Sequence, residues 1–268
     1  MGREKEGQEN IARHCQKEKL GTRLLRSSSS FAALLAWIAG LSLAAAENGL
    51  VPFSRLTSDD RQALEEVVSG PTLSREVKEV KFRSRKEVYE YLLNHPDFAA
   101  AVARAFGLSE YQIVKDAKVV RASGDSYWGT DGRGATGHFR VVYADEKKRV
   151  FFLDGTLNKN WLPTIFARSV MVLIFDHKAD REGSYVENDL YGYIKIDNTL
   201  VAYLAKLLRP IIGSMAHEKI KHILSVGATV SEVAYRDPAG FLKKLEESPE
   251  LPRKECDEFR QTLHVNVQ

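Results

Sequence analysis

One stretch of the sequence decides the fold: residues 135–157, ATGHFRVVYADEKKRVFFLDGTL. Its two ends are rich in aromatic and β-branched residues, which is typical of β-strands. The middle, Ala144–Lys148, is short and charged, as hairpin loops often are. Two strands joined by so short a connection are antiparallel neighbours. The stretch therefore predicts a β-hairpin within an antiparallel sheet.

The same strand-like composition continues on both sides of this hairpin. Polar, glycine-containing turns at Thr130–Gly134 and Asp180–Gly183 separate the segments. A first strand is predicted over residues 74–82, although its apolar residues alternate imperfectly. The other predicted strands cover residues 111–121, 124–130, 135–144, 148–157, 167–177 and 184–196.

Helical patterns lie before and between these strands. Thr57–Asp60 is typical of a helix start, and Gly70 ends that helix. Ser84 is a suitable N-cap for a second helix, which Pro96 interrupts. A third helix then ends at Gly107. The chain thus runs from a strand into a helix-turn-helix before the main run of strands.

The helix predicted after the last strand is the longest. Asp197 or Asn198 caps its start, and Pro210 is expected to kink it. Its apolar residues share one face: Leu200, Leu204, Leu207, Leu208, Ile211 and Met215. The sequence therefore predicts an antiparallel sheet closed by one long helix.

This order of elements is accompanied by five characteristic stretches: Val80–Val88, Asn94–Phe98, Gly137–Val141, Arg149–Phe152 and Ile194–Asn198. Together they resemble the START-like helix-grip superfamily, the StAR-related lipid-transfer and polyketide cyclase group, over residues 74–226. The resemblance implies an α+β helix-grip fold, a curved antiparallel β-sheet wrapped around a long C-terminal α-helix. It also implies an apolar tunnel between sheet and helix. Pro210 and the segment after about residue 228 depart from the family pattern.

Four parts follow from this interpretation. They are a signal peptide or membrane anchor (1–46), an N-terminal helix and linker (47–73), the START-like domain (74–226), and a helical extension and tail (227–268). In the last part, Val233, Phe241, Leu242 and Leu245 predict a short amphipathic helix. Residues 246–268 are expected to be loosely attached.

The net positive charge of the chain comes from its N-terminal part. Residues 1–46 hold 7 Lys and Arg against 4 Asp and Glu, so of the 39 and 36 in the whole chain, 32 of each remain. Arg23 and Arg26 precede an apolar run at 31–43, and Ala44 and Ala46 follow as small residues at a cleavage site. The pattern predicts export to the periplasm or the cell exterior, or alternatively an anchor through residues 31–43.

The concave face of the sheet supplies the candidate ligand-binding residues. Alternation along the strands places an apolar set there: Tyr127, Phe139, Val141, Phe151, Leu153, Val170, Val172, Tyr191 and Tyr193. Leu204, Leu207 and Leu208 would face them from the long helix. The alternative is ordinary core packing, because pockets and cores use the same residue types.

The segment Asn158–Phe166 is predicted to be a loop with unusually apolar side chains. Trp161 and Phe166 would act there as a lid or a membrane-touching entrance to the tunnel, or else pack permanently on the long helix. Arg168 follows the loop. It would either bind a polar headgroup at the tunnel mouth or lie exposed at the surface.

Several other functions lack support in the sequence. His217 and His222 are five residues apart, whereas a zincin motif needs four. Cys15 and Cys256 have no partners at metal-ligand or redox spacing. The glycines between residues 129 and 137 precede no helix, so they do not form a phosphate loop. We therefore expect no metal, cofactor or catalytic motif, and the balanced charge of residues 47–268 disfavours a nucleic-acid partner.

Three functions remain open. The first is a carrier that binds and transports a lipid, sterol-like molecule, quinone or fatty acid, with transient membrane contact. The second is a cyclase- or hydrolase-type enzyme on the same scaffold, using Tyr, Asp or His138 side chains inside the cavity. The third is an envelope protein-interaction module, which would have a filled core.

Overall fold

The computed structural model describes residues 49–116, 125–160, 162–198 and 209–263. The predicted signal sequence, residues 1–46, lies outside the described residues. So do four of the predicted ligand residues: Trp161, Leu204, Leu207 and Leu208. Among the described helices, none has the length and apolar character needed to cross a membrane.

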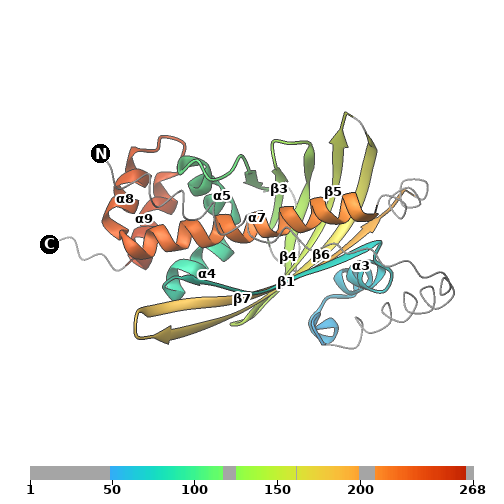
Figure 1. The fold of residues 1–268 in the computed structure, drawn as a ribbon, viewed down its shortest axis with the longest axis horizontal. Coiled ribbons are helices and arrows are strands. Elements are labelled where there is room, and N and C mark those ends of the chain that lie inside the picture. The colour runs from blue at the N-terminus through green and yellow to red at the C-terminus, as the bar shows by residue number, and fades with distance from the viewer. Residues whose placement is uncertain (1–48, 117–124, 161, 199–208, 264–268) are drawn as a thin grey trace, which may run out of the picture. The chain divides into compact units, whose positions relative to one another are not determined.

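A seven-stranded antiparallel sheet forms the body of the protein, in the order β1-β7-β6-β5-β4-β3-β2. The strands are β1 (Leu73–Arg83), β2 (Gln112–Lys115), β3 (Ser126–Thr130), β4 (Ala135–Ala144), β5 (Lys148–Lys159), β6 (Leu162–Asp180) and β7 (Gly183–Ile196). Helix α7 (Arg209–Arg236) runs across one face of this sheet (Figure 1). The predicted α+β helix-grip class is confirmed.

The hairpin at residues 135–157 forms as predicted, with β4 and β5 joined by a short turn. The next hairpin is tighter than predicted. β5 extends to Lys159 and β6 begins at Leu162, so Leu157 pairs with Ile165 and Lys159 with Leu162. The predicted apolar loop is therefore wrong, because the apolar residues there continue the two strands.

β1 contains an irregularity that explains its imperfect alternation. Its pairing with β7 shifts between Val77 and Val80. Within the shift, Glu79 has a φ of 59°, and its backbone N–H donates to Asp189 Oδ1 at 2.8 Å. The extra residue of such a bulge breaks the period of two.

The helix pair lies beside this strand. It consists of α4 (Lys86–Asn94) and α5 (Pro96–Ala105), with Pro96 in the first turn of α5, where its missing N–H costs nothing. Gly107 follows α5 with a φ of 67°. The N-cap of α4 is Arg85, not Ser84, because the Ser84 hydroxyl donates to the Arg85 carbonyl instead of capping the helix.

The C-terminal region is helical and docked. α7 continues without a break across residues 226–227, so the predicted boundary there falls inside a helix. α8 (Pro238–Glu247) and α9 (Arg253–Thr262) follow. Phe241, Leu245 and Phe259 are buried in one cluster with α4 and α5. The expectation of a loosely attached segment after residue 246 is wrong for the described residues, because α9 buries Phe259 completely.

The convex face of the sheet is covered by α3 (Ser58–Val68), which begins as predicted with the Thr57 hydroxyl accepting from the Asp60 N–H. A short 3-10 helix, η1 (Phe53–Arg55), precedes it. Leu64 and Val67 of α3 pack on Val170 and Val172, and all four are fully buried. This interface is an ordinary filled core.

Candidate ligand-binding cavity

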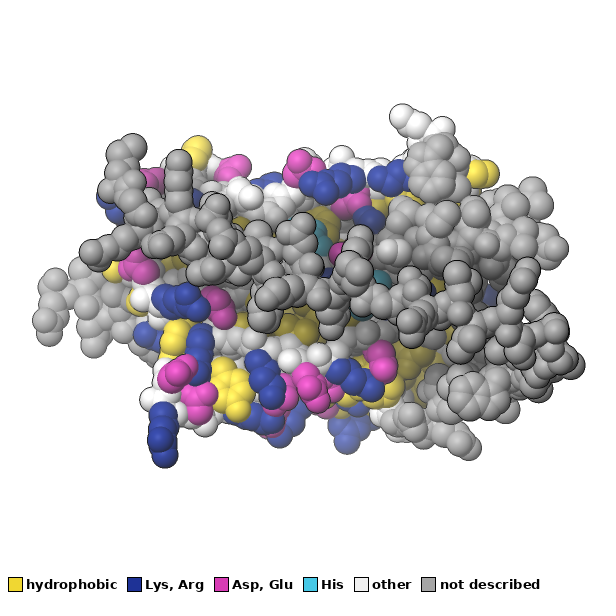
Figure 2. Space-filling view, in the orientation of Figure 1, with side chains coloured by type: hydrophobic (Ala, Val, Ile, Leu, Met, Phe, Trp, Pro, Cys, Tyr) yellow, Lys and Arg dark blue, Asp and Glu magenta, His cyan; other side chains and the backbone are white. Residues whose placement is uncertain are grey.

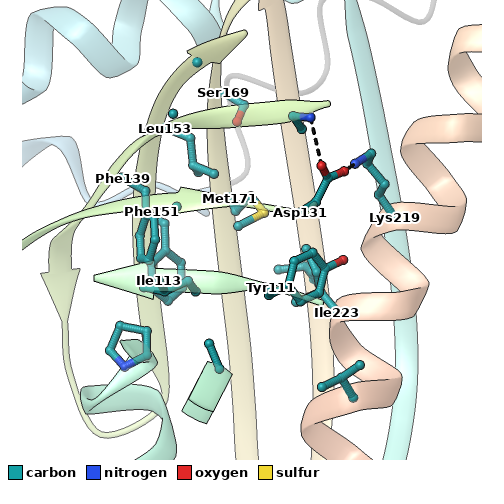
Figure 3. Close-up of a pocket in the computed structure, with 18 of the residues that line it drawn as sticks. Tyr111, Ile113, Asp131, Phe139, Phe151, Leu153, Ser169, Met171, Lys219 and Ile223 are labelled. Carbon is teal, nitrogen blue, oxygen red and sulfur yellow. Dashed lines mark hydrogen bonds and ion pairs between the residues drawn. The ribbon is translucent and has the colours of Figure 1, made fainter. Parts of the chain in front are cut away.

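A cavity of about 590 Å³ lies between the concave face of the sheet and α7. Its described lining is mainly apolar and comes from strands of the sheet and from α4, α5 and α7. Figure 3 shows side chains from the sheet and from α7 pointing into one space, among them Ile113, Phe139, Phe151, Leu153, Met171 and Ile223. Volumes of this size are typical of small-molecule sites.

The space exists because α7 does not approach the whole sheet. The helix packs closely along β1, whereas the central strands do not approach it to the same extent. α5, which also borders the cavity, contributes the small side chains Ala99, Ala100 and Ala103. The helices therefore leave room above the middle of the sheet.

A row of residues with little or no side chain crosses the concave face. Gly129 pairs with Gly137, Gly137 with Gly155, and Gly155 with Ala167. A Cβ on Gly137 would lie 2.5 Å from the Asp154 carbonyl oxygen, and one on Gly155 would lie 2.5 Å from the Thr136 carbonyl oxygen. Glycine at these two positions permits the close approach of β4 and β5. It also leaves the floor of the cavity without side chains.

Aromatic rings form the adjoining wall. Phe139 and Phe151 line the cavity. Tyr127 stacks on Phe139, with ring centroids 5.2 Å apart and planes inclined by 17°. Tyr127 is 3% exposed, and its burial raises the pKa of the phenol above its ordinary value. The stacking holds Phe139 in position at the wall.

The cavity is elongated along α7. Its lining includes residues from Ala216 to Ser231, and 15 helical rises of 1.5 Å give a length of about 22 Å. Ile223 is 43% exposed and the Lys219 side chain 39% exposed, so solvent reaches the cavity along this part of α7. Tyr111 and Ile113 face them from the other side (Figure 3).

An ion pair lies at this opening of the cavity, where Lys219 Nζ donates a hydrogen bond to Asp131 Oδ2. Asp131 is 9% exposed, and its other oxygen accepts the backbone N–H groups of Arg133 and Ala135, each at 2.8 Å. Burial alone would raise the pKa of the Asp131 carboxyl, but the hydrogen bonds from Lys219 and the two amides outweigh it and lower that pKa. Asp131 is therefore ionised and fixed in place.

The predicted ligand residues separate according to strand face. Phe139 and Phe151 border the cavity, while Tyr127 lies on the same face behind Phe139. Tyr191 and Tyr193 lie on the opposite, convex face, where Tyr193 belongs to the core beneath α3. The prediction that these two tyrosines, Val170 and Val172 lie on the concave face is wrong. Helices cover both faces of the sheet, so β6 and β7 carry apolar residues on both sides and alternation alone does not identify the concave one.

Arg168 and Phe166 also lie on the convex side. Arg168 Nη1 is 2.6 Å from Glu66 Oε2, and its Nη2 is 2.7 Å from Asp197 Oδ1. These hydrogen bonds raise the pKa of Arg168 and tie β6 to α3. Phe166 is 51% exposed on the same face. Neither side chain borders the cavity.

His138, suggested for the enzyme hypothesis, points away from the cavity as well. His138 pairs with Asp154 and is adjacent in the strand to Gly137, which pairs with Gly155. Because successive residues of a strand face opposite sides, the His138 side chain lies on the face opposite the glycine row. The imidazole Nδ1 lies 3.7 Å from Asp116 Oδ2, and the side chain is 60% exposed. The backbone of β4 at this position borders the cavity, but the ring does not supply an acid or base inside it.

Sequence reasoning missed the polar and small residues of the site. Asp131 and Lys219 are 88 residues apart, and nothing in the local sequence pairs them. Ser169 and Met171 were also missed, although they share a face with Leu153 and Phe151 through the register of β5 and β6. One signal of the site was present in the sequence, namely glycine at positions 129, 137 and 155 of three neighbouring strands.

The described part of the chain holds no metal-ligand group, and one of its faces carries mixed charges. No group of three or more His, Cys, Asp or Glu side chains there is arranged to hold a metal ion. On the face in Figure 2, described Lys and Arg side chains are interspersed with Asp and Glu. This mixture agrees with the balanced composition of residues 47–268.

No family model matches the chain, and no curated protein does. Similar solved structures include the di-domain ARO/CYC protein BexL from the BE-7585A biosynthetic pathway, at 15% identity and a TM-score of 0.37, covering 62% of this chain. The chain spans about half the length of that protein, 53%.

Two others are a conserved protein from Geobacillus kaustophilus and Ara h 8.0201. The first has 12% identity and a TM-score of 0.33, covering 58% of this chain and 93% of the other. The second has 10% identity and a TM-score of 0.33, covering 59% and 97%. At these scores, the assignment of the site rests on its own geometry.

Proposed function

We propose that this protein binds a hydrophobic small molecule in the cavity between the concave face and α7. The observation that carries the proposal is a cavity of about 590 Å³ with an apolar lining that opens to solvent beside Ile223. An apolar molecule that enters it leaves water, and burial of apolar surface is favourable by about 25 cal/mol per Å². Binding would thus depend on desolvation and would need no chemistry.

The ligand classes that fit are lipids, sterol-like molecules, quinones and fatty acids. The length of about 22 Å along α7 favours an elongated molecule. Transport is part of the proposal, because a cavity that opens to solvent can both load and release its ligand. We further propose export through residues 1–46, or anchoring through residues 31–43, with transient membrane contact. N-terminal sequencing of the protein from its native source distinguishes cleavage from anchoring.

A cyclase- or hydrolase-type enzyme on the same scaffold is the second candidate. The Asp131–Lys219 pair favours it, because an acid and an amine meet at the edge of an apolar cavity. Turnover of a bound ester or polyketide that is lost in Lys219→Met would support this candidate. The third hypothesis, an interaction module with a filled core, conflicts with the open cavity.

Uptake of a neutral fluorescent probe tests the proposal. We expect N-phenyl-naphthylamine to bind the wild-type protein with increased fluorescence and one-to-one saturation. Ser169→Phe places a ring over the cavity floor and should reduce the affinity at least about tenfold. His138→Phe adds a similar ring to the opposite face and serves as the matched control. Equal binding by all three proteins would place the probe outside the cavity and contradict the proposal.

A further inference from the structure

The pair Asp131 and Lys219 constrains the charge of the ligand. Asp131 is held by two backbone N–H groups in addition to Lys219, so it cannot turn away when a ligand arrives. Lys219 has three N–H donors, and its described partner uses one of them. The opening therefore offers spare hydrogen-bond donors beside a fixed negative charge (Figure 3).

The other charged residues of the described lining do not point their side chains into the cavity. Besides the pair, the lining contains Asp154 and His138, whose side chains lie on the convex face by register. At the rim, Arg133 Nε lies 3.3 Å from Glu110 Oε2, so these two charges offset each other. The described lining thus presents one cation and one anion, in contact with each other, and beside the rim Lys159 Nζ donates to the Arg133 carbonyl oxygen at 2.6 Å.

A charged ligand meets an opposing charge in this arrangement. A carboxylate that approaches Lys219 would lie within a few ångström of Asp131, and a repulsion at that distance offsets the attraction. An ammonium that approaches Asp131 meets Lys219 in the same way. Either ion would also lose its hydration next to an apolar wall. A carbonyl or hydroxyl oxygen accepts a hydrogen bond from Lys219 without these costs.

We propose that the cavity selects elongated apolar molecules whose polar end is a neutral hydrogen-bond acceptor, held by Lys219, and discriminates against carboxylic acids and amines of equal length. This inference rests on the proposed function. It narrows the ligand classes to alcohols, ketones, quinones and sterol-like molecules, and it excludes fatty acids as preferred ligands.

The test compares probes that share one alkyl chain. Dodecanol, dodecanoic acid and dodecylamine compete for N-phenyl-naphthylamine in the intact protein at pH 7. We expect dodecanol to bind about tenfold more tightly than either ion, a difference of about 1.4 kcal/mol. Equal or tighter binding of the acid or the amine would overturn the inference while leaving the proposed function intact. Absence of binding by every probe would overturn both.

Charge variants provide a second, independent measurement. Asp131→Asn keeps an oxygen for the two backbone N–H groups but leaves Lys219 unopposed, so the preference should shift toward dodecanoic acid by about tenfold. Lys219→Met should shift it toward dodecylamine. The double variant Arg133→Met with Glu110→Gln removes both charges of the rim pair, whose side chains are 72% and 64% exposed, and should leave the ranking unchanged. An unchanged ranking in all three variants would contradict the role of the pair.

Discussion

Phe151 and Phe152 are neighbours in β5 that lie on opposite faces of the sheet. Phe152 is 5% exposed and packs beneath α3, together with the fully buried Val150, Val170 and Val172. Phe151 borders the cavity, across from α7. The same residue type therefore belongs to a filled core on one face and to an open site on the other.

The comparison shows that hydrophobic composition does not create the cavity. α3 reaches the convex face directly, and Arg140 and Asp60 hold it there through a buried ion pair with a Nη2 to Oδ1 distance of 2.8 Å. α7 instead packs along β1, and the glycine row removes side chains from the floor below it. The distance of the covering helix and the absence of side chains decide which face is hollow.

The largest expected difference separates the two phenylalanines. Phe152→Ala should lower the free energy of unfolding by about 3–5 kcal/mol, because it empties a close-packed site. Phe151→Ala should cost less, about 1–2 kcal/mol, since the ring already borders unfilled space. Chemical denaturation of both variants measures the difference. Equal losses would mean that the concave face is packed like the convex one.

The ion pair beneath α3 gives the next effect. Arg140→Met leaves the Asp60 carboxylate, which is 4% exposed, without this guanidinium and should destabilise the protein by about 3 kcal/mol. The double variant Asp60→Leu with Arg140→Met removes both charges and should recover most of the loss. Equilibrium unfolding in urea provides the measurement. If the double variant is less stable than Arg140→Met, the pair is not the reason for the loss.

Two alanine substitutions in the glycine row should differ in their effect on stability. Gly137→Ala should cost about 1–3 kcal/mol, because its Cβ would lie 2.5 Å from a backbone oxygen that must move. Gly129→Ala should cost less than about 1 kcal/mol, since the nearest atom to its Cβ is at 3.4 Å. Thermal denaturation compares the two. A Gly129→Ala variant that is equally unstable would contradict the distinction within the row.

The smallest expected effect is the pH dependence of the stability that Asp131 contributes. The pKa of Asp131 is lower in the folded protein than its ordinary value, so its ionised form contributes stability above the unfolded-state pKa of about 3.9. That contribution disappears as the pH falls through the lowered, folded-state pKa. The stability advantage of wild type over Asp131→Asn should therefore be complete at pH 7 and smaller at a pH below about 3.9. Denaturation curves at both pH values test this, and a constant difference would contradict it.

Local patterns predicted much of the fold because local chemistry sets it. The β4–β5 hairpin, the Thr57 cap and the break at Pro96 all depend on neighbouring residues. Strand faces were harder to assign, because β6 and β7 are apolar on both sides and a shift of one residue exchanges the faces. This is why Tyr191 and Tyr193 were expected in the cavity and lie on the convex face instead.

The polar part of the site was beyond the reach of sequence patterns. Asp131 lies in a turn and Lys219 on a helix, and their contact depends on where α7 crosses the sheet. The docking of α9 has the same origin, because Phe259 packs against Tyr91 and Phe98 of the helix pair as well as against Phe241 of α8. Long-range packing of this kind leaves no periodic signal in either segment.

Native mass spectrometry of the protein after gentle purification, followed by organic extraction, tests the central claim most directly. We predict a mass increase that corresponds to one apolar, neutral molecule in the wild-type protein, and its absence in Ser169→Phe. A wild-type protein that carries no ligand and takes up none of the offered apolar molecules would contradict the claim that the concave face is a binding site.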